Sequence, residues 1–275
     1  MSIKSLVYLL TRIGLTQQQM YRLAAARTVV LGVLNPRFLK GVVIELSTYC
    51  NRRCSYCPLC VLGCSDEVMS EEMVDRVADN MAGFTGTIDI GGFYSEPLAR
   101  LPIVRLALPR IRKAAPGAFL RMYSNGDYLT EELLEELFSF GLDYLYITVH
   151  DNSEKRRATI KSWPAARDGR VRVDLARELV LFNRSGYVVQ GAVPPARGCV
   201  LQFAPVISVD GSVFLCCTDL QGKSRLGNLK TERLTDIARR TYRLRLKILF
   251  GGLPTEPCRQ CAQPTLGTLP FKGFD

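Results

Sequence analysis

The sequence predicts an α/β fold built around a parallel sheet, and two observations support this prediction. Short apolar runs with strand character recur through the first two thirds of the chain, at 41–46, 87–92, 119–125, 144–149, 170–175 and 187–193. Helical patterns with 3/4 spacing lie between these runs, for instance at 73–81 and, after the N-cap-like Thr130, at 133–138. Strands that alternate with helices form right-handed βαβ units. This pattern alone is equally compatible with an open sheet and a partial barrel.

The two ends of the chain differ from this central part. Residues 3–35 have an apolar spacing that predicts one or two helices. Towards the other end, the Asp210-Gly211 dipeptide predicts the turn of a hairpin over 206–217, and a long helix is predicted at about 231–248. We therefore expect an N-terminal helical extension over 1–40, an α/β core over 41–195, and a small C-terminal domain of a hairpin plus a helix over 196–275.

The chain contains ten cysteines, five of them between residues 50 and 64 and five in the C-terminal part. Disulfide scaffolds are usually much shorter, secreted chains. The apolar stretches at the N-terminus are interrupted by basic residues, so no secretory signal is expected. No run of residues approaches the roughly 18 apolar residues that a membrane span needs. We therefore expect a reducing, cytoplasmic compartment in which the thiols are free to bind metal.

His150 is the one histidine of the chain. A Ser-His-Asp triad would consume it, and zinc sites of the Cys/His type would lack ligands. Any metal is therefore expected to be held mainly by thiolates, which suit iron–sulfur clusters or zinc.

The formal net charge of +10 is unevenly distributed along the chain. Residues 1–40 hold six basic and no acidic side chains, and 223–247 hold nine basic against two acidic ones. Such a surface fits an acidic redox partner, an anionic substrate, a membrane contacted through residues 1–40, or simply a solvated helix face. Nucleic acid is not an expected partner, because no aromatic residues are interleaved with the basic ones in a binding motif.

Polar residues are predicted at the carboxyl ends of four successive strands. Cys50 follows the first strand, Glu96 the second, Asn125 the third and His150 the fourth. Parallel α/β sheets place their active sites at this edge, in open sheets and in barrels alike. These positions therefore predict an active site there before any motif is considered.

The first five cysteines have two spacings that fit iron–sulfur clusters. Cys50, Cys54 and Cys57 form C-x-x-x-C-x-x-C, which would leave one iron of a cluster open. The four cysteines from Cys54 to Cys64 instead have the spacing of bacterial ferredoxins, which would close the cluster. The ferredoxin spacing normally occurs twice and is followed by proline, whereas this chain has one such run, followed by Ser65. The three-cysteine arrangement is therefore favoured.

The segment CNRRCSYC, with Tyr56 just before its third cysteine, resembles the signature of the radical SAM superfamily. The resemblance covers about residues 41–193 and implies a partial (β/α)6 TIM-like barrel. It also implies that Cys50, Cys54 and Cys57 hold three irons of a [4Fe–4S] cluster whose fourth iron binds S-adenosylmethionine (SAM). An open iron serves the purpose that an open coordination position serves in catalytic zinc sites.

Two further segments match the same family. GGFYSEPL (91–98) resembles the family's GGE-type segment, which implies that Glu96, with Ser95, lies near the methionine amino group. YSNGDYLT (123–130) resembles the segment whose polar residues approach the ribose or the carboxylate of SAM. A purely structural role at a strand end fits His150 equally well. The residues implied to bind the cofactor are Tyr56, Gly92, Ser95, Glu96, Ser124, Asn125 and His150.

The C-terminal cysteines resemble those of SPASM and twitch domains, in which a C…G-x-x-x-x-C opening precedes a helix and a C-x-x-C pair. No cysteine follows Cys261, which implies the shorter twitch form with one auxiliary [4Fe–4S] cluster. The implied ligands are Cys199, Cys216, Cys258 and Cys261, with Cys217 as an alternative to Cys216. Four such cysteines would also suit a structural zinc ion.

The resemblance implies an oxidoreductase or an epimerase. A reduced flavodoxin or ferredoxin would supply an electron, SAM would yield a 5′-deoxyadenosyl radical, and the radical would abstract a hydrogen atom from the substrate. Transfer of an electron from the substrate radical to the auxiliary cluster gives a ketone, whereas donation of hydrogen from a thiol to the opposite face gives an epimer. The thiols considered as donors are Cys60, Cys64 and Cys217, which are otherwise incidental thiols.

Small twitch-bearing relatives commonly act on sugar or aminocyclitol intermediates of natural-product pathways, so the resemblance implies a small-molecule substrate. A radical SAM peptide maturase is an alternative, although an extension of residues 1–40 is short for a peptide-recognition domain. The alternative from another class is an electron-transfer protein with closed clusters.

Overall fold

The computed structural model describes residues 17–63, 65–91, 95–179, 199, 201–219, 222–252 and 254–261. The strands of these residues form one sheet in the order β5-β4-β3-β2-β1-β6-β7-β8. Strands β1 to β5 are parallel, β6 is parallel to β1, and β7 and β8 continue the sheet in antiparallel fashion. The bounds are β1 (Gly41–Ile44), β2 (Thr87–Ile90), β3 (Phe119–Ser124), β4 (Tyr144–Val149), β5 (Val171–Leu175), β6 (Val206–Ile207), β7 (Ser212–Phe214) and β8 (Arg225–Asn228).

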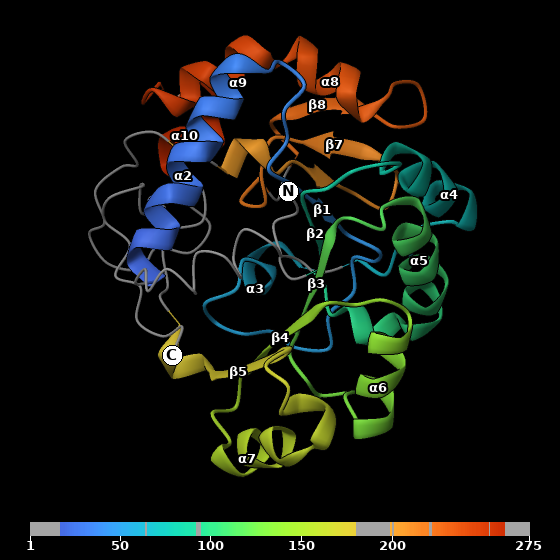
Figure 1. The fold of residues 1–275 in the computed structure, drawn as a ribbon. Coiled ribbons are helices and arrows are strands. Elements are labelled where there is room, and N and C mark those ends of the chain that lie inside the picture. Colours follow the sequence, from blue (N-terminus) through green and yellow to red (C-terminus); the bar gives the residue numbers. More distant parts are fainter. Residues whose placement is uncertain are drawn as a thin grey trace.

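Helices connect the parallel strands and cover one face of the sheet (Figure 1). The α-helices are α2 (Gln17–Leu34), α3 (Leu59–Leu62), α4 (Glu71–Asn80), α5 (Leu101–Ala114), α6 (Glu131–Ser139), α7 (Glu154–Ser162), α8 (Leu234–Arg240), α9 (Tyr242–Leu249) and α10 (Glu256–Gln260). Short 3-10 turns are η1 (Pro97–Arg100), η2 (Pro164–Ala166), η3 (Ala176–Glu178) and η4 (Leu201–Phe203).

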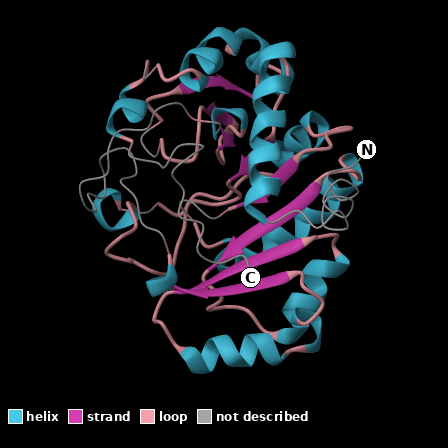
Figure 2. Cartoon of the chain, turned by 60° about the vertical axis from the view of Figure 1, so that its left-hand side comes forward, coloured by secondary structure: helices cyan, strands magenta, loops and turns pink. Residues whose placement is uncertain are grey.

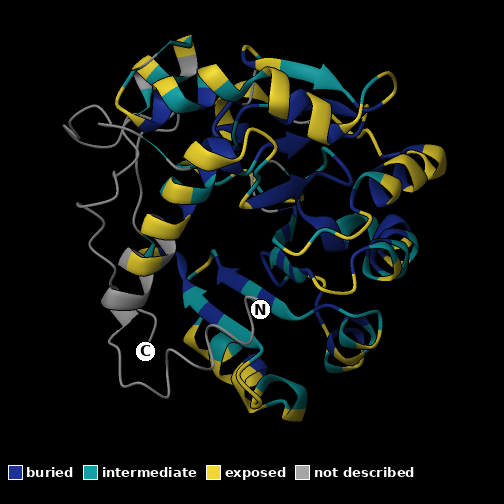
Figure 3. Cartoon of the chain, turned by 45° about the horizontal axis from the view of Figure 1, so that its top comes forward, coloured by how far each residue is buried: buried dark blue, intermediate teal, exposed yellow. Residues whose placement is uncertain are grey.

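The main core lies between the sheet and helices α4 to α6. Alternate residues of β3, such as Leu120 and Met122, are fully buried, as are Val104 and Leu108 of α5, which belong to the same cluster. Figure 2 shows the strands fanning across the middle of the molecule, and Figure 3 shows them buried below the exposed outer turns of the helices. Because successive strand residues point to opposite faces, the remaining residues of β2 to β5 form a second face.

Five of the six predicted strands and the predicted helix cap are found in the described residues. The first five predicted strands correspond to β1 to β5, and the sixth, at 187–193, lies outside the described residues. Thr130 caps α6 as predicted, since its side chain accepts a hydrogen bond from the amide of Leu133 (3.2 Å). The helix predicted over 3–35 is α2 from Gln17 onwards, and the residues before Gln17 are outside the description.

The C-terminal hairpin is present and extends the parallel sheet. Strands β6 and β7 pair around Asp210-Gly211, and Val206 of β6 lies opposite Val43 of β1. The single helix predicted over 231–248 is wrong, because α8 ends and α9 begins at Thr241. The hydroxyl of Thr241 donates to the carbonyl of Ile237 (2.8 Å), and such side-chain bonds compete with the helical pattern.

The N-terminal helix packs against the C-terminal part of the chain, which the sequence does not indicate. A side chain on Gly32 of α2 would meet the ring of Phe203 at 2.4 Å, so the close approach requires glycine. Arg245 of α9 is 1% exposed and donates to the carbonyls of Pro36 (2.6 Å), Phe38 (2.7 Å) and Ala238. Burial lowers the pKa of Arg245 to about 10, so its guanidinium is still charged at neutral pH.

In the part of the chain that the structure describes, no helix is both long enough and apolar enough to cross a membrane.

We expect Arg245→Met to lower the free energy of unfolding by about 3 kcal/mol or more, because the carbonyls of Pro36, Phe38 and Ala238 lose the charged group that donates to them. Arg243→Met on the same helix is the matched control, since Arg243 is exposed and its loss should change stability by less than about 0.5 kcal/mol. Urea unfolding followed by circular dichroism measures both. Equal effects of the two substitutions would contradict the role given to Arg245.

Candidate active site

The first three cysteines lie in the loop that follows β1, at the carboxyl edge of the parallel strands. The amide of Cys57 donates to the carbonyl of Cys54 (2.9 Å), and the amide of Arg52 donates to Cys50 Sγ (3.4 Å). Burial raises the pKa of the Cys50 thiol to about 11, and the neighbouring Cys57 and Cys54 add to this effect. The loop therefore gathers three thiols that would release their protons on binding metal.

The carboxylate of Asp127 ties this loop to the turn after β3. Its Oδ2 accepts hydrogen bonds from Asn51 Nδ2 (2.8 Å) and Arg52 Nε (2.5 Å), and its Oδ1 accepts one from Arg52 Nη2 (2.6 Å). Arg156 Nη1 of α7 donates to the same Oδ1 (2.5 Å). Burial acts to raise the pKa of Asp127, but the hydrogen bonds from Arg52 and Asn51 outweigh it and lower the pKa. The ion pair between Arg52 and Asp127 thus holds the segment between Cys50 and Cys54 in place.

Tyr56 provides a second connection, to the residue that follows β4. Its hydroxyl is hydrogen-bonded to Nδ1 of His150, and the two ring centroids are 5.9 Å apart. Burial, together with the positive charge of Arg52, lowers the pKa of His150 to about 4. The imidazole is therefore neutral at pH 7, and its tautomer determines which partner donates this bond. His150 is in this way placed beside the third cysteine of the loop.

Glu96 connects the ends of β2 and β3 and is only 2% exposed. Its Oε1 accepts hydrogen bonds from Ser124 Oγ (2.8 Å) and the amide of Leu98 (3.1 Å), and its Oε2 accepts one from the amide of Asn125 (2.6 Å). Burial raises the pKa of Glu96 to about 7, although these hydrogen bonds act in the opposite direction. A carboxylate has about four acceptor positions, so about one is left for a ligand.

The side chain of Asn125 points to the cysteine loop. Its Nδ2 donates to Asn51 Oδ1 (2.8 Å), and its Oδ1 accepts from the amide of Asp127 (2.9 Å). Ser124 is 7% exposed and Asn125 is 4% exposed. The structure therefore brings Ser124 and Asn125 together with Glu96, in a hydrogen-bonded support below the loop.

Ser95 lies at the same edge but contacts a different residue. Its hydroxyl donates to Oε2 of the buried Glu45, the residue after β1 (2.8 Å). Gly92, which the resemblance also implies to bind SAM, lies outside the described residues.

The face of the sheet that points away from α4 to α6 is polar and is called the inner face below. Arg121 forms a bidentate ion pair with Asp89 (2.7 and 2.9 Å), and Arg172 forms an ion pair with Asp174 (2.9 Å). Tyr146 donates to Asp174, and its ring lies 5.5 Å from that of Tyr123. The inner face consists of Asp89, Arg121, Tyr123, Tyr146, Arg172 and Asp174.

Four cysteines of the C-terminal part are neighbours. Burial raises the pKa of Cys199 to about 11, and the thiols of Cys261 and Cys258 add to the shift. Burial likewise raises the pKa of Cys216 to about 12, with Cys199 and Cys261 among its neighbours. Three of the sulfurs are in hydrogen bonds: Cys199 with the amide of Leu201 (3.3 Å), Cys216 with the Thr218 hydroxyl (3.2 Å) and Cys258 with the Thr255 hydroxyl (3.0 Å).

The adjacent Cys216 and Cys217 have different surroundings. Cys217 is 8% exposed, packs with Val43 and Val206, and interacts electrostatically with Tyr123 of the inner face. Cys216 instead lies with the other C-terminal cysteines, as described above.

Of the other two thiols near the first loop, Cys60 is among the described residues. Cys60 is exposed, and its Sγ lies 3.5 Å from the carbonyl oxygen of Ser55. Cys64 lies outside the described residues.

Thiolates in groups of three and four suit iron–sulfur clusters. Within the described ranges, no three histidine, cysteine or acidic side chains are grouped closely enough to hold one ion. A [4Fe–4S] cluster separates its ligand sulfurs, because each thiolate binds a different iron. Hydrogen bonds to the sulfurs are also among the features that tune such clusters. The set of three suits a cluster with one open iron, and the set of four suits a closed one.

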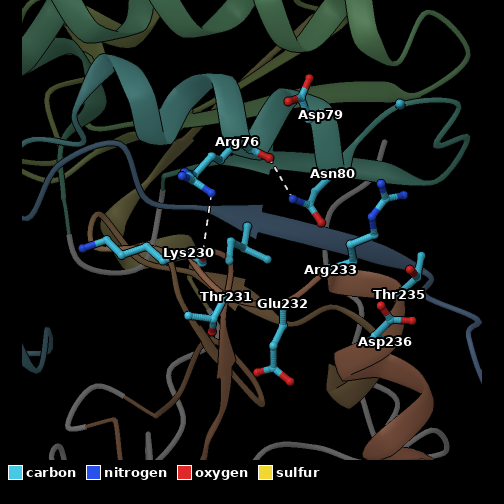
Figure 4. A pocket seen from close by; sticks show the side chains of 11 residues that line it. Arg76, Asp79, Asn80, Lys230, Thr231, Glu232, Arg233, Thr235 and Asp236 are labelled. Atoms are coloured by element: carbon cyan, nitrogen blue, oxygen red, sulfur yellow. Dashed lines mark hydrogen bonds between the residues drawn. The ribbon is translucent and has the colours of Figure 1, made fainter.

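Two cavities are lined in part by the C-terminal domain. One of about 510 Å³ lies between the segments that flank the cysteine loop and the hairpin, and is lined by Glu45, Thr48, Ser208 and Asp219 among others. A larger one of about 710 Å³ lies between α4 and the segment 229–236 (Figure 4).

The larger cavity lies at a structural joint between the core and the C-terminal domain. Asn80 Oδ1 accepts the amide of Leu234 at the start of α8 (2.8 Å) and so serves as its cap. Arg76 donates to the carbonyl of Lys230 across the same joint (3.5 Å). The smaller cavity instead contacts the residues on both sides of the cysteine loop, Thr48 before it and Leu59 and Ser65 after it.

Several residues of this edge were not identified from the sequence. They are Glu45, Asn51, Arg52, Asp127 and Arg156. Arg52 lies within CNRRCSYC and Asp127 within YSNGDYLT. Their presence in two segments that match the family could have marked both as candidate site residues. Their pairing depends on strand order and could not be read from either segment.

Comparisons with known proteins agree with this arrangement. The family model described as the radical SAM superfamily matches residues 44–177, and the SPASM model, described as an iron–sulfur cluster-binding domain, matches residues 199–262. The S-adenosyl-L-methionine-dependent 2-deoxy-scyllo-inosamine dehydrogenase of Niallia circulans is 27% identical over 240 residues, which are 82% of this chain and 94% of the relative.

Solved structures show the same likeness. The crystal structure of BtrN in complex with AdoMet and 2-DOIA aligns with 26% identity and a TM-score of 0.74, over 82% of this chain and 93% of BtrN. BtrN in an open conformation aligns with 23% identity and a TM-score of 0.64, over 82% and 92% of the two chains, which shows a shared fold.

We expect Asp127→Asn to weaken iron retention at the first cysteine group, because the loop loses its charged contacts with Arg52 and Arg156. Substituting residues that support metal ligands typically costs about 10–100-fold in metal affinity. Iron per chain after anaerobic reconstitution and desalting measures the effect. Glu136→Gln, which breaks the exposed pair with Arg105, is the control and should retain wild-type iron. Wild-type iron content in Asp127→Asn would contradict the anchoring role.

Glu96 should make the stability of the fold depend on pH. Between about pH 4.5 and 7 the unfolded chain has lost this proton while the buried carboxyl, whose pKa is about 7, still holds it. The stability contributed by Glu96 is therefore present in full below about pH 4.5 and is lost as the pH rises to about 7.

Glu96→Gln tests this expectation, because glutamine does not titrate. The difference in unfolding free energy between wild type and variant, measured by urea unfolding at several pH values, should shift steadily against the wild type over that range. Profiles that stay parallel would show that Glu96 keeps an ordinary pKa.

Proposed function

This chain belongs to the radical SAM superfamily and carries a SPASM-type iron–sulfur domain, and we propose that it oxidises a secondary alcohol of a small polyhydroxylated substrate to a ketone. The observation that carries the proposal is the pair of separate thiol groups, three at the carboxyl edge of β1 and four in the C-terminal domain. Alcohol oxidation requires the substrate to lose a hydrogen atom, a proton and one further electron. A cluster with an open iron would bind SAM and deliver the electron that cleaves it. A fully ligated cluster would accept the electron that the substrate loses.

We assign the ligands accordingly. Cys50, Cys54 and Cys57 would hold the cluster that binds SAM, and Cys199, Cys216, Cys258 and Cys261 would hold the auxiliary cluster. The position of Cys216 beside Cys199 and Cys261 supports its choice over Cys217. When bound, these groups supply the 5′-deoxyadenosyl radical and the electron acceptor.

The protein's own contribution is positioning. Asp127 and His150 hold the cysteine loop through Arg52 and Tyr56, and Glu96 supports the same edge through Ser124 and Asn125. We propose that Tyr56, Gly92, Ser95, Glu96, Ser124, Asn125 and His150 form or support the SAM site. The three parts 1–40, 41–195 and 196–275 are proposed as extension, core and auxiliary domain, which the matched residues 44–177 and 199–262 support.

The proposed substrate is a sugar or an aminocyclitol that binds along the inner face. Paired carboxylates, guanidinium groups and tyrosines there offer both donors and acceptors to a ring with several hydroxyl groups. The relative from Niallia circulans is named for the dehydrogenation of 2-deoxy-scyllo-inosamine, which supports an aminocyclitol or a similar polyol.

We propose a reduced flavodoxin or ferredoxin as the electron donor and the cytoplasm as the location. The described cysteines are all free thiols, which fits a reducing compartment.

The reaction can be tested with the reconstituted protein, dithionite and SAM. We expect about eight iron and eight sulfide per chain, and a change in the electron paramagnetic resonance spectrum when SAM is added. Without a change on adding SAM, a closed-cluster electron carrier would be the correct class. Candidate aminocyclitols incubated in deuterated water should give a ketone without uptake of solvent deuterium.

An epimerase is the second candidate, and the position of Cys217 favours it. The Cys217 thiol lies among Val43, Val206 and Tyr123, at the border of the inner face. An epimerase would give an inverted carbon that carries solvent deuterium, and Cys217→Ala would still cleave SAM without completing turnover. Full turnover by Cys217→Ala would exclude this thiol as the hydrogen donor and leave the dehydrogenase.

A further inference from the structure

Helices α2 and α9 share a surface that is apolar and basic. Neither helix contains an acidic residue. Among the described residues, nine large apolar side chains are exposed, and five of them lie on α2 or directly after α9. Most exposed apolar residues are scattered singly on folded proteins, whereas a concentration of this kind marks an interaction surface.

The outer side of α2 is a regular apolar stripe. Leu23, Val30 and Leu34 are 48%, 54% and 74% exposed, and Arg27 is exposed between them. Their spacing of four, three and four residues places them on one side of the helix. Figure 3 shows exposed turns along this helix.

The opposite side of α2 packs against the rest of the protein. Thr28 is 3% exposed, and Gly32 lies against the ring of Phe203. The apolar stripe therefore faces outwards because the inner side is already occupied by its own packing.

Helix α9 continues this surface with positive charge. Arg243, Lys247 and Phe250 are exposed at spacings of four and three, and Phe250 is 72% exposed. Tyr242 donates to the carbonyl of Val33, so the start of α9 lies against the end of α2 (Figure 1). Arg245, on the buried side of α9, locks the two helices in this arrangement through the carbonyls of Pro36 and Phe38.

We propose that the α2–α9 surface docks the protein on a bilayer that contains anionic phospholipids. Its apolar side chains would enter the headgroup region, and its basic side chains would meet the phosphates. The charge of the surface is complementary to such a bilayer, since Arg27, Arg243 and Lys247 are exposed on it and neither helix contains an acidic residue. An acidic protein partner would not explain the exposed leucine, valine and phenylalanine side chains.

Sedimentation with vesicles tests the proposal on the full chain with its clusters reconstituted. Wild type should bind vesicles of phosphatidylcholine and phosphatidylglycerol and should bind pure phosphatidylcholine vesicles more weakly. The double substitution Arg243→Glu and Lys247→Glu should lower the binding by more than about tenfold, because each basic residue near such a surface contributes about 1 kcal/mol. Val30→Ser with Leu34→Ser should also lower it, by removing the apolar contact.

The matched charge control is Lys113→Glu with Lys155→Glu, on α5 and α7, where both lysines are exposed. Val68→Ser removes an exposed apolar side chain elsewhere. Both controls should bind vesicles as the wild type does, and circular dichroism with iron content should show that every variant is folded.

Three results would overturn the proposal. The first is no preference of the wild type for anionic vesicles, and the second is an equal loss of binding in Lys113→Glu with Lys155→Glu. The third is a dimer in gel filtration that Val30→Ser with Leu34→Ser dissociates, without any vesicle binding, because the surface would then join two copies of this chain.

Discussion

Strand β1 is paired along both of its edges, and the position of both cysteine groups depends on this. It is parallel to β2 on one side and to β6 on the other, with the amide of Val43 bonded to Pro205 and that of Glu45 to Ile207 (2.9 Å each). The first cysteine loop follows β1, and the hairpin that begins with β6 leads to Cys216. One short, buried strand therefore sets the distance between the place where SAM is proposed to bind and the auxiliary cysteines.

The cysteine loop itself contains little regular structure, so its position has to come from side chains. Asn51 and Asp127 are 76 residues apart in the sequence and are joined because β1 and β3 end at the same edge of the sheet. An exposed ion pair such as Arg105 with Glu136 stabilises little, because water competes for both charges. The Asp127 carboxylate is 16% exposed and accepts four hydrogen bonds, so its contacts are better shielded and more directional.

The sequence predicted those features that depend on local pattern. Alternating runs located β1 to β5, Thr130 located the start of α6, and Asp210-Gly211 located the hairpin turn. It did not predict that Arg52 pairs with Asp127 while the adjacent Arg53 donates to the carbonyl of Cys50, since both arginines look alike in the motif. The break at Thr241 was missed because the apolar spacing continues across it, while the hydroxyl bond from Thr241 to Ile237 is not visible in that spacing. The position of Arg245 depends on buried carbonyls of distant segments, which propensity does not show.

The neighbouring Cys216 and Cys217 show how one residue of register can separate two chemical roles. β7 ends at Phe214, and a bend at Leu215 and a turn that begins at Cys217 follow it directly. Cys216 there lies with the auxiliary cysteines, whereas Cys217 lies with Val43, Val206 and Tyr123. The antiparallel pairing of Val206 with Phe214 and of Ile207 with Val213 fixes this register. The same hairpin thus carries a proposed ligand of the auxiliary cluster and, one residue later, the thiol proposed as a hydrogen donor, so the two proposed fates of a substrate radical, oxidation and hydrogen donation, are assigned to adjacent residues.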